Sequence, residues 1–343
     1  MTSLENLKTL VSLPGVSGRE HAVRDAVINE IKGYADDWRV DGMGNLIVTK
    51  KGERRPKTKL MLSAHMDEVG FIVTHITKEG FLKFAAVGGI DRRVVPGRQV
   101  FVGESAVPGV IGIKPVHLVK GDDREKSIPM DELCIDIGAD SREEAQEAVS
   151  LGDEVAFDTA ADFSRGTIKA KAIDDRAGCA VLVSLIQSDL PYDMTFAFVV
   201  QEEIGLRGSR CAAFSVEPDA CIVVEATTAA DIPGVEEHKQ VCRVGKGAVL
   251  SFMDKSTIYD KEYYDLLRRL AEEKGIPCQI KEAVAGGNDA GAIHITRGGI
   301  RTIAVSVPCR YLHSPMGLIS ASDFEAVEAL VRAGAAAIAG LEK

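Results

Sequence analysis

Five side chains of types that bind metal ions occur at the ends of apolar segments or in short polar motifs. His65 follows the apolar segment KLMLS, Glu203 follows MTFAFVVQ, and Glu225 ends the run ACIVVE. Asp174 lies in the motif AIDDR and His313 in the motif YLHS. Ligands of open α/β sheets gather beyond the carboxyl ends of the strands. Two histidines and three carboxylates at such an edge predict a metal site with nitrogen and oxygen ligands, which suits zinc, cobalt or manganese.

The acidic pairs in this set are informative because of what precedes them. Paired acids such as Asp174-Asp175 are common on solvated helices, whereas Glu202 and Glu203 abruptly end a run that reads as a buried strand. Buried carboxylates are costly unless cations offset their charge. Two divalent ions carry four positive charges, which Asp174, Glu203, Glu225 and one hydroxide would balance. We therefore expect two metal ions rather than one.

Asp67 lies two residues after His65, a spacing that lets both side chains share one face of a strand. A His-x-Asp pair by itself is more often an exposed or internally satisfied polar pair. Beside a metal site, however, Asp67 would accept a hydrogen bond from the ring nitrogen that faces away from the metal. We expect Asp67 to orient His65 in this way.

Hydrophobic periodicity predicts an α/β architecture around these residues. Two helices fill the first 35 residues, and Ser17, three residues before Glu20, predicts a capping box at the start of the second helix, which runs to Ile31. Short strands follow at 38–40, 45–49 and 59–63. After residue 164, strands at MTFAFVVQ, DACIVVEA and RTIAVSV alternate with helices at 176–188, 260–274, 289–298 and 322–340. This alternation predicts a predominantly parallel sheet.

The segment between residues 69 and 163 has a different pattern. β-rich runs such as VGFIVTHI, GFLKFAAV and EVAFDT recur there, separated by Gly and Pro. Their spacing of roughly 8–15 residues is typical of a small barrel or sandwich, with one helix near 141–149. We therefore predict a discontinuous catalytic domain, residues 1–67 and 164–343, interrupted by an inserted β-rich domain, residues 68–163.

Composition and charge argue against several classes of protein. The 343 residues carry a formal net charge of -10, whereas nucleic-acid binding requires a basic surface. The longest apolar runs are too short to span a bilayer and no signal peptide is recognisable, so we expect no membrane association. Seven scattered cysteines without a CxxC spacing predict free thiols in a reducing cytoplasm.

Motifs along the whole chain, beyond those of the expected site, resemble those of one family. They are PGVSGRE (14–20), DGMGNL (41–46), SAHMDEVGF (63–71), IDIGA (135–139), AIDDRAG (172–178), VQEEIGLRGSR (200–210), AADIPG (229–234), GKG (245–247), GGNDAGAIH (286–294) and SVPCRYLHS (306–314). In this order they closely resemble the M42 family of metallo-aminopeptidases, the tetrahedral-aminopeptidase and glutamyl-aminopeptidase group. The resemblance implies a three-layer αβα catalytic domain of the zinc-peptidase type with an inserted small β-barrel-like domain.

Carried over position by position, the resemblance implies roles for the site residues. It implies two overlapping sets of metal ligands: His65, Asp174 and Glu225 for one ion, and Asp174, Glu203 and His313 for the other. Asp174 would then bridge the ions, Glu202 would be the general base, and Asp67 would be a supporting catalytic residue. Many family members have Asp at the position of Glu225, whose longer side chain leaves its mode of ligation open.

The resemblance also implies the reaction and the partners. We expect an aminopeptidase that releases N-terminal amino acids from short peptides by means of a water bridging two divalent ions, zinc first, with cobalt or manganese as alternatives. Dimers formed through residues 68–163 would assemble into a dodecamer. Two other readings stay open: a related two-metal amidohydrolase or deacylase, and a glycoside hydrolase such as an endoglucanase. A single Trp and 5% aromatic residues argue against the second, because sugar clefts are rich in aromatic side chains.

Overall fold

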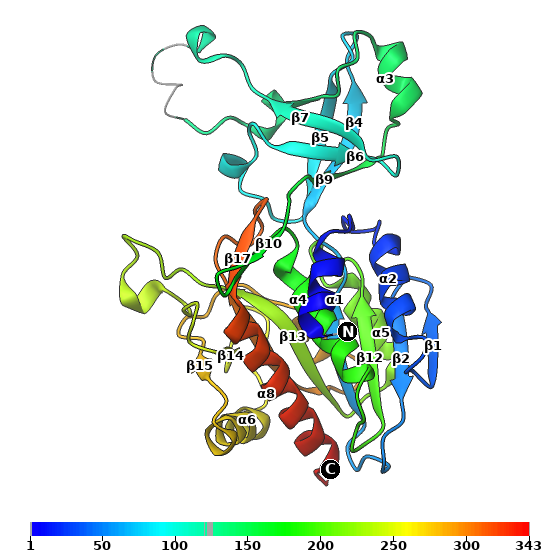
Figure 1. Cartoon of the computed structure of the whole chain (residues 1–343), viewed down its shortest axis with the longest axis vertical. Coiled ribbons are helices and arrows are strands. Elements are labelled where there is room, and N and C mark those ends of the chain that lie inside the picture. The colour runs from blue at the N-terminus through cyan, green and yellow to red at the C-terminus, as the bar shows by residue number, and fades with distance from the viewer. Residues whose placement is uncertain (1, 120, 122–125, 343) are drawn as a thin grey trace.

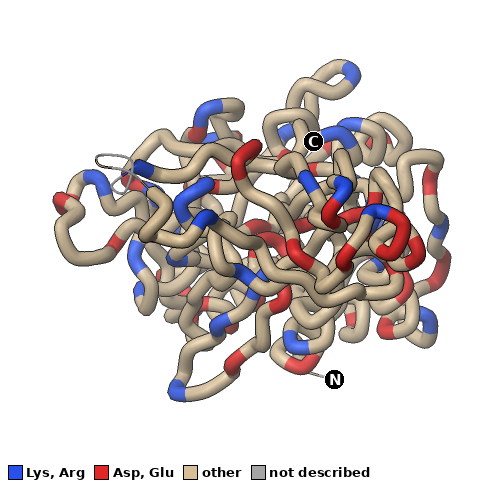
Figure 2. Tube along the Cα trace, turned by 90° about the horizontal axis from the view of Figure 1, so that it is seen from above, with Lys and Arg blue, Asp and Glu red and all other residues tan. Residues whose placement is uncertain are grey.

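In the computed structural model, the chain folds into an α/β part and a β-barrel, which stand one above the other in Figure 1. The structure describes residues 2–119, 121 and 126–342. The barrel strands lie between Gly70 and Phe157, and the α/β part contains the segments before and after them. In the view of Figure 2, acidic and basic residues are interspersed along the trace. No helix in the described ranges is long and apolar enough to cross a membrane.

A mixed sheet forms the centre of the α/β part. Over the described residues it has eight strands in the order β1-β2-β12-β3-β13-β16-β14-β15. The strands are β1 (Asp37–Val40), β2 (Leu46–Lys50), β3 (Leu60–His65), β12 (Met194–Val199), β13 (Ala220–Thr228), β14 (Ala248–Leu250), β15 (Cys278–Ile280) and β16 (Arg301–Cys309). The pairs β12/β3, β3/β13, β13/β16 and β14/β15 are parallel, and β1/β2, β2/β12 and β14/β16 are antiparallel. The parallel ladders therefore surround β3 and β13, which carry predicted site residues.

Helices cover both faces of this sheet, so every residue of β3 is buried. They are α1 (Ser3–Val11), α2 (His21–Ile31), α4 (Ile173–Ile186), α5 (Arg207–Val216), α6 (Lys261–Lys274), α7 (Ala290–Ile293) and α8 (Ala321–Gly340). Helices α4 and α8 contact each other and the central strands. Helices α5 and α7 also contact each other, and α5 lies against β12 whereas α7 lies against β16. Helices α1 and α2 pack on α4, and α6 packs on α8. The predicted three-layer αβα fold is confirmed.

The barrel is closed, in the strand order β4-β5-β8-β7-β6-β9. Its elements are β4 (Gly70–Ile76), β5 (Leu82–Val87), β6 (Gln99–Val102), β7 (Val107–Gly112), β8 (Cys134–Asp136), α3 (Arg142–Ala148) and β9 (Glu154–Phe157). In its core, the Phe71 ring packs edge-on against Phe84 and Phe157, at centroid distances of 4.9 Å and 5.3 Å. Of the two architectures expected for this segment, the barrel is therefore the one that forms.

A small antiparallel sheet lies between the two parts. It consists of β10 (Asp162–Ser164), β11 (Thr167–Ala170) and β17 (Gly317–Ser320), and Ala170 pairs with Gly317. Strand β11 leads into the start of α4, which contains Asp174, and β17 follows the turn that contains His313. The pairing of β11 with β17 thus brings two distant predicted ligands to the same place.

Two local predictions about helices are wrong. Ser17 does not cap α2: its hydroxyl donates to Asp67 instead, and the N-cap residue Glu20 makes no side-chain capping bond. The helix expected at 289–298 is only α7, which ends at Ile293. A continuous helix to residue 298 is also incompatible with Arg297, which has a left-handed φ of 55°.

The strand that contains Glu225 is longer at its C-terminal end than the predicted strand DACIVVEA. Strand β13 continues beyond it, because the parallel ladder with β16 extends to the pair Thr228–Cys309. Glu225 therefore projects from the middle of a paired strand, where its backbone is fixed by hydrogen bonds on the β16 side.

Candidate metal centre

The five predicted metal ligands lie together near one edge of the central sheet. His65 is the last residue of β3, and Glu225 lies in the neighbouring parallel strand β13. Asp174 lies in the first turn of α4. Glu203 occupies the turn between β12 and α5, and His313 occupies the turn between β16 and β17. A strand end supplies His65, a helix start supplies Asp174, two turns supply Glu203 and His313, and the interior of β13 supplies Glu225.

His65 and two carboxylates form the first group. The Nε2 atom of His65 lies 3.2 Å from Oδ1 of Asp174 and 3.4 Å from Oε1 of Glu225. The possible ligand atoms of these three residues all lie within 4.8 Å of one another. A single metal ion fits such a cluster of one imidazole nitrogen and two carboxylate oxygens.

His313 and two carboxylates form the second group, which shares Asp174 with the first. The Nε2 atom of His313 lies 3.3 Å from Oδ2 of Asp174 and 3.3 Å from Oε1 of Glu203. These ligand atoms also lie within 4.8 Å of one another. The two oxygens of the Asp174 carboxylate therefore face two different histidines.

Both imidazole rings are oriented through their Nδ1 atoms. Nδ1 of His65 lies 3.1 Å from the carbonyl oxygen of Asp67 and 3.4 Å from its Oδ1. Nδ1 of His313 lies 3.0 Å from the carbonyl oxygen of Gly89, in the segment between β5 and β6 of the barrel. Since a carbonyl oxygen only accepts hydrogen bonds, each Nδ1 carries a proton, and each Nε2 is the nitrogen that could bind a metal in place of its own proton.

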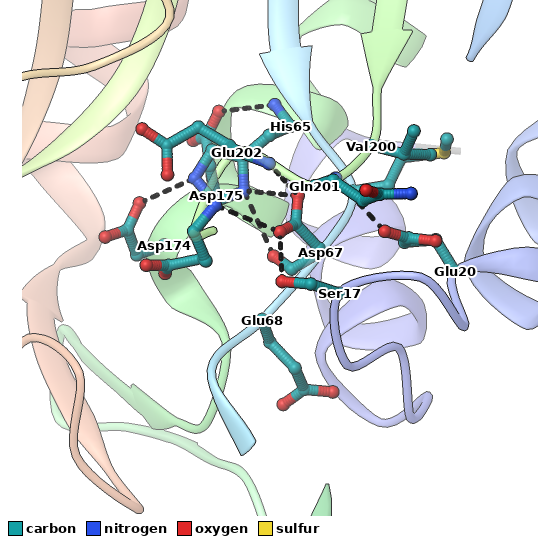
Figure 3. A network of polar contacts seen from close by, with 12 residues as sticks. Ser17, Glu20, His65, Asp67, Glu68, Asp174, Asp175, Val200, Gln201 and Glu202 are labelled. Carbon is teal, nitrogen blue, oxygen red and sulfur yellow. Dashed lines mark hydrogen bonds and ion pairs between the residues drawn. The ribbon is translucent and has the colours of Figure 1, made fainter. Parts of the chain in front are cut away.

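Asp67 connects His65 with the acidic turn after β12 (Figure 3). Its Oδ1 accepts a hydrogen bond from the backbone N–H of Glu202 at 3.0 Å, and its Oδ2 accepts one from the N–H of Glu203 at 3.1 Å. The Ser17 hydroxyl donates to Oδ2 at 2.6 Å. Asp67 is completely buried, so these donors take the place of water. One carboxylate therefore positions His65, Glu202 and Glu203 together.

Glu20 holds the same turn from the other side, as Figure 3 also shows. Its Oε1 accepts hydrogen bonds from the backbone N–H of Gly18 at 2.7 Å and of Gln201 at 3.1 Å. Gln201 has a left-handed φ of 57°, which is uncommon for a residue with a side chain. The N-terminal PGVSGRE segment is thus part of the framework of the site. Sequence patterns assign Ser17 and Glu20 only to a helix cap.

The carboxylates raise the pKa values of both histidines. Burial lowers the pKa of His65, but Glu225 and Asp174 raise it more, and the net pKa lies well above the usual range. Burial also opposes protonation of His313, yet Asp174 and Glu203 raise its pKa to about 11. Both effects show that the cluster carries an excess of negative charge that favours additional cations.

The carboxyl groups show the same excess. Burial raises the pKa values of Glu202 and Glu225 well above the usual range, although the nearby His65 opposes this shift. Asp175, which follows Asp174 through a cis peptide bond, is fully buried and has a similarly raised pKa. Burial raises the pKa of Asp289 to about 6. Divalent ions would offset this charge, and the nitrogen and oxygen donors fit zinc, cobalt or manganese.

A cavity of about 220 Å³ adjoins the cluster. His65, Glu202 and Glu225 line it on the metal side, and Lys281 and Asn288 line it farther along. A single water needs only about 10–15 Å³ of such space, so an amino-acid side chain fits beside the metal centre. Neither the periodicity nor the motifs of the sequence single out Lys281, which follows the short strand β15.

An αβα fold with two adjoining groups of histidines and carboxylates could hold metal ions for hydrolytic chemistry. A model of the M42 glutamyl aminopeptidase family matches residues 44–330. The chain therefore belongs to the M42 family of metal-dependent aminopeptidases.

Two relatives and one solved structure illustrate the similarity. A protein of Acetivibrio thermocellus that carries an aminopeptidase name is 42% identical over 95% of this chain and 97% of its own length. The lysyl aminopeptidase of Pyrococcus furiosus is 33% identical over 97% of this chain and 96% of its own length. The TET1 peptidase of Pyrococcus horikoshii, described as assembling into a tetrahedron or a large octahedral shell, is 36% identical and superposes with a TM-score of 0.86, covering 97% of this chain and 98% of that one.

Proposed function

We propose that this aminopeptidase holds two divalent metal ions in the two overlapping ligand groups described above. The observation that carries the proposal is the position of Asp174, whose Oδ1 faces His65 and whose Oδ2 faces His313. One carboxylate that reaches both groups can bridge two ions roughly 3.5–4 Å apart. Glu225 and Glu203 would each complete one group. Zinc is the proposed metal, with cobalt or manganese as alternatives.

Bound ions would polarise the scissile carbonyl and lower the pKa of a water between them toward ~7. Glu202 is the proposed general base: its carboxylate takes the proton of the attacking water and returns it to the leaving amine. This carboxylate lines the cavity beside His65, and burial raises its pKa, which makes it a better proton acceptor near neutral pH. The bond from the Glu202 N–H to Asp67 fixes the backbone from which the base projects.

The proposed substrates are short peptides with a free N-terminus. The N-terminal side chain would occupy the cavity of about 220 Å³, so that the scissile carbonyl lies over the metal cluster at one side of this space. A substrate held there has its reacting bond next to Glu202, as proton transfer requires.

The proposed domain division assigns catalysis to residues 1–67 and 164–343 and self-association to residues 68–163. Exposed apolar side chains support the second assignment, among them Ile113, Val116 and Leu118, which are 52%, 69% and 58% exposed. Groups of this kind are typical of interfaces. Dimers would assemble further into a dodecamer. The shell described for the TET1 peptidase is a precedent for such assembly in a similar chain. A cytoplasmic location stays a prediction based on the cysteine pattern.

The activity is tested with three classes of substrate, each with and without a chelator. Aminoacyl-p-nitroanilides report aminopeptidase activity, N-acetyl-amino acids report deacylation, and carboxymethylcellulose reports glycoside hydrolysis. We expect chelator-sensitive release of nitroaniline alone. Chelator-insensitive cleavage of cellulose, or hydrolysis of acylated but not free N-termini, would replace the proposal with one of its alternatives.

A further inference from the structure

Lys281 is a buried cation for which the described part of the chain provides no ion-pair partner. It directly follows β15, at the edge of the central sheet in Figure 1, and its backbone N–H donates to the carbonyl of Leu250 at 2.9 Å. The residue is only 7% exposed, and its Nζ donates a hydrogen bond to the carbonyl oxygen of Ala285 at 2.7 Å. Among the described residues, no carboxylate forms an ion pair with it. Burial lowers its pKa, as expected for an ammonium group whose charge is incompletely compensated.

Nearby acids are occupied elsewhere. Among the acids, Asp254 raises the pKa of Lys281 the most. Its oxygens, however, accept hydrogen bonds from the backbone N–H groups of Ser256 and Thr257 and from the hydroxyl of Tyr259. Glu225 acts on Lys281 from the metal cluster and would be engaged by a bound ion there. An uncompensated buried charge is costly, so the site gains if a ligand brings an anion to Nζ.

Lys281 lines the same cavity as the metal cluster. The cavity wall also contains neutral polar and apolar side chains such as Thr227, Ser306 and Leu312. Lys281 is its only Lys or Arg within the part of the chain that the structure describes. One cavity of about 220 Å³ thus has a proposed reaction centre at one side and a single ammonium group at another. A residue bound with its scissile carbonyl at the metals would extend its side chain into this space.

The wall around Lys281 is firmly held. The carbonyl of Gly286, next to the Lys281 acceptor Ala285, accepts a hydrogen bond from the N–H of Lys255 at 2.9 Å. A Cβ at Gly287 would come within 2.7 Å of the Ser256 hydroxyl, so this glycine allows the two segments to touch. Because the wall is fixed, the ammonium group is already in position when a substrate arrives.

We propose that Lys281 is the specificity-determining residue of the cavity and selects peptides whose N-terminal residue has an acidic side chain. This inference rests on the proposed metal centre as the place of reaction. Family membership does not decide the preference, because the family is described as glutamyl aminopeptidase while a relative of similar length is a lysyl aminopeptidase. A glutamyl carboxylate would accept a charge-assisted hydrogen bond from Nζ and replace water there.

The test compares glutamyl-, glutaminyl- and lysyl-p-nitroanilide on the zinc-loaded full chain. Glutamine has nearly the shape of glutamate without its charge, so the ratio of kcat/KM values isolates the contribution of the carboxylate. One charge-assisted hydrogen bond in a buried site predicts a glutamyl preference of roughly 10- to 100-fold over glutaminyl. Lys281→Met should bring this ratio close to one, and Lys281→Arg should keep it above one. Lys255→Met is the matched control: it removes a charge from an exposed residue of the adjoining wall and should leave the ratio unchanged.

The outcomes separate the inference from the proposed function. Absence of activity on these three anilides would overturn the inference, and absence of activity on leucyl-p-nitroanilide as well would contradict the proposed function itself. Activity with equal glutamyl and glutaminyl rates would overturn the inference while leaving the aminopeptidase intact. A preference that survives in Lys281→Met, or a Lys281→Met variant that slows all three substrates equally, would show a structural role for Lys281. Should Lys281→Met fail to fold, the wild-type ratio and the Lys281→Arg ratio still decide, because a neutral wild-type ratio refutes the selection.

Discussion

Replacing Asp67 by asparagine tests whether one buried carboxylate organises the site. Asp67→Asn keeps the shape of the side chain but exchanges one acceptor oxygen for an NH₂ group. In one orientation this NH₂ faces the backbone N–H of Glu202, and in the other it faces the N–H of Glu203. Either way, one buried N–H group loses its acceptor, and His65 faces a neutral partner in place of a carboxylate.

The magnitude follows from these contacts. A buried N–H without an acceptor costs about 1–3 kcal/mol, and weakening of the remaining charge-assisted bonds adds roughly 1 kcal/mol, so we expect a loss of about 2–4 kcal/mol in the free energy of unfolding. With about 2.1 cal/mol/K per residue, the 343 residues correspond to about 0.7 kcal/mol/K, so the melting temperature should fall by about 3–6 °C. Loss of a partner that orients a metal ligand should reduce kcat/KM by about 10–100-fold.

The assay combines thermal unfolding at a fixed protomer concentration with hydrolysis of an aminoacyl-p-nitroanilide. Asp323→Asn is the matched control, because Asp323 is also buried and accepts two backbone hydrogen bonds, from Gly245 at 2.6 Å and Gly247 at 2.7 Å. It should lose comparable stability without loss of kcat/KM. If Asp67→Asn keeps its melting temperature within 1 °C or so and its activity within about twofold, the assignment of Asp67 as the organising group is refuted.

Three further predictions concern the metals and the base. Glu202→Gln should retain both ions by elemental analysis but lower kcat by about 10²–10⁴-fold, since a positioned proton acceptor is lost; near-normal turnover would contradict the assignment of the base. His65→Ala and His313→Ala should each reduce the metal content, because each removes the imidazole of one ligand group; unchanged occupancy in either variant would argue against ligation by that histidine. Removal of metal with a chelator should abolish activity and lower the melting temperature, because the buried carboxylates lose the cations that offset their charge. Added zinc should restore both, and a melting temperature indifferent to the chelator would show that no ion is held in the folded state.

Local patterns predict the elements that carry the site. The apolar runs before His65 and around Glu225 form buried strands, and these strands are parallel neighbours. Side chains at corresponding levels of such strands must come close together. The grouping of carboxylates with histidines could therefore be predicted without knowledge of any contact.

Contacts between distant segments could not be predicted in this way. Ser17 has the spacing of a helix cap, yet the folded chain brings its hydroxyl to Asp67, and the buried acceptor prevails over the local cap. Lys281 is an ordinary lysine in the sequence and becomes unusual only because the fold buries it beside a cavity. The strand around Glu225 was predicted to end at Ala226, where the apolar run stops, whereas the ladder to β16 continues to Thr228.

The hydrogen bond between His313 and the carbonyl of Gly89 joins the barrel to the metal centre. The two parts therefore differ from independent modules that could be separated or exchanged. An enzyme reduced to its α/β part would keep every proposed metal ligand but lose the hydrogen bond that orients the His313 ring through Nδ1. On heating, unfolding of the barrel would remove the hydrogen bond between Gly89 and His313. We therefore expect one metal ion to be released before the central sheet unfolds. The order in which the two ions leave would thus record which part of the molecule unfolds first.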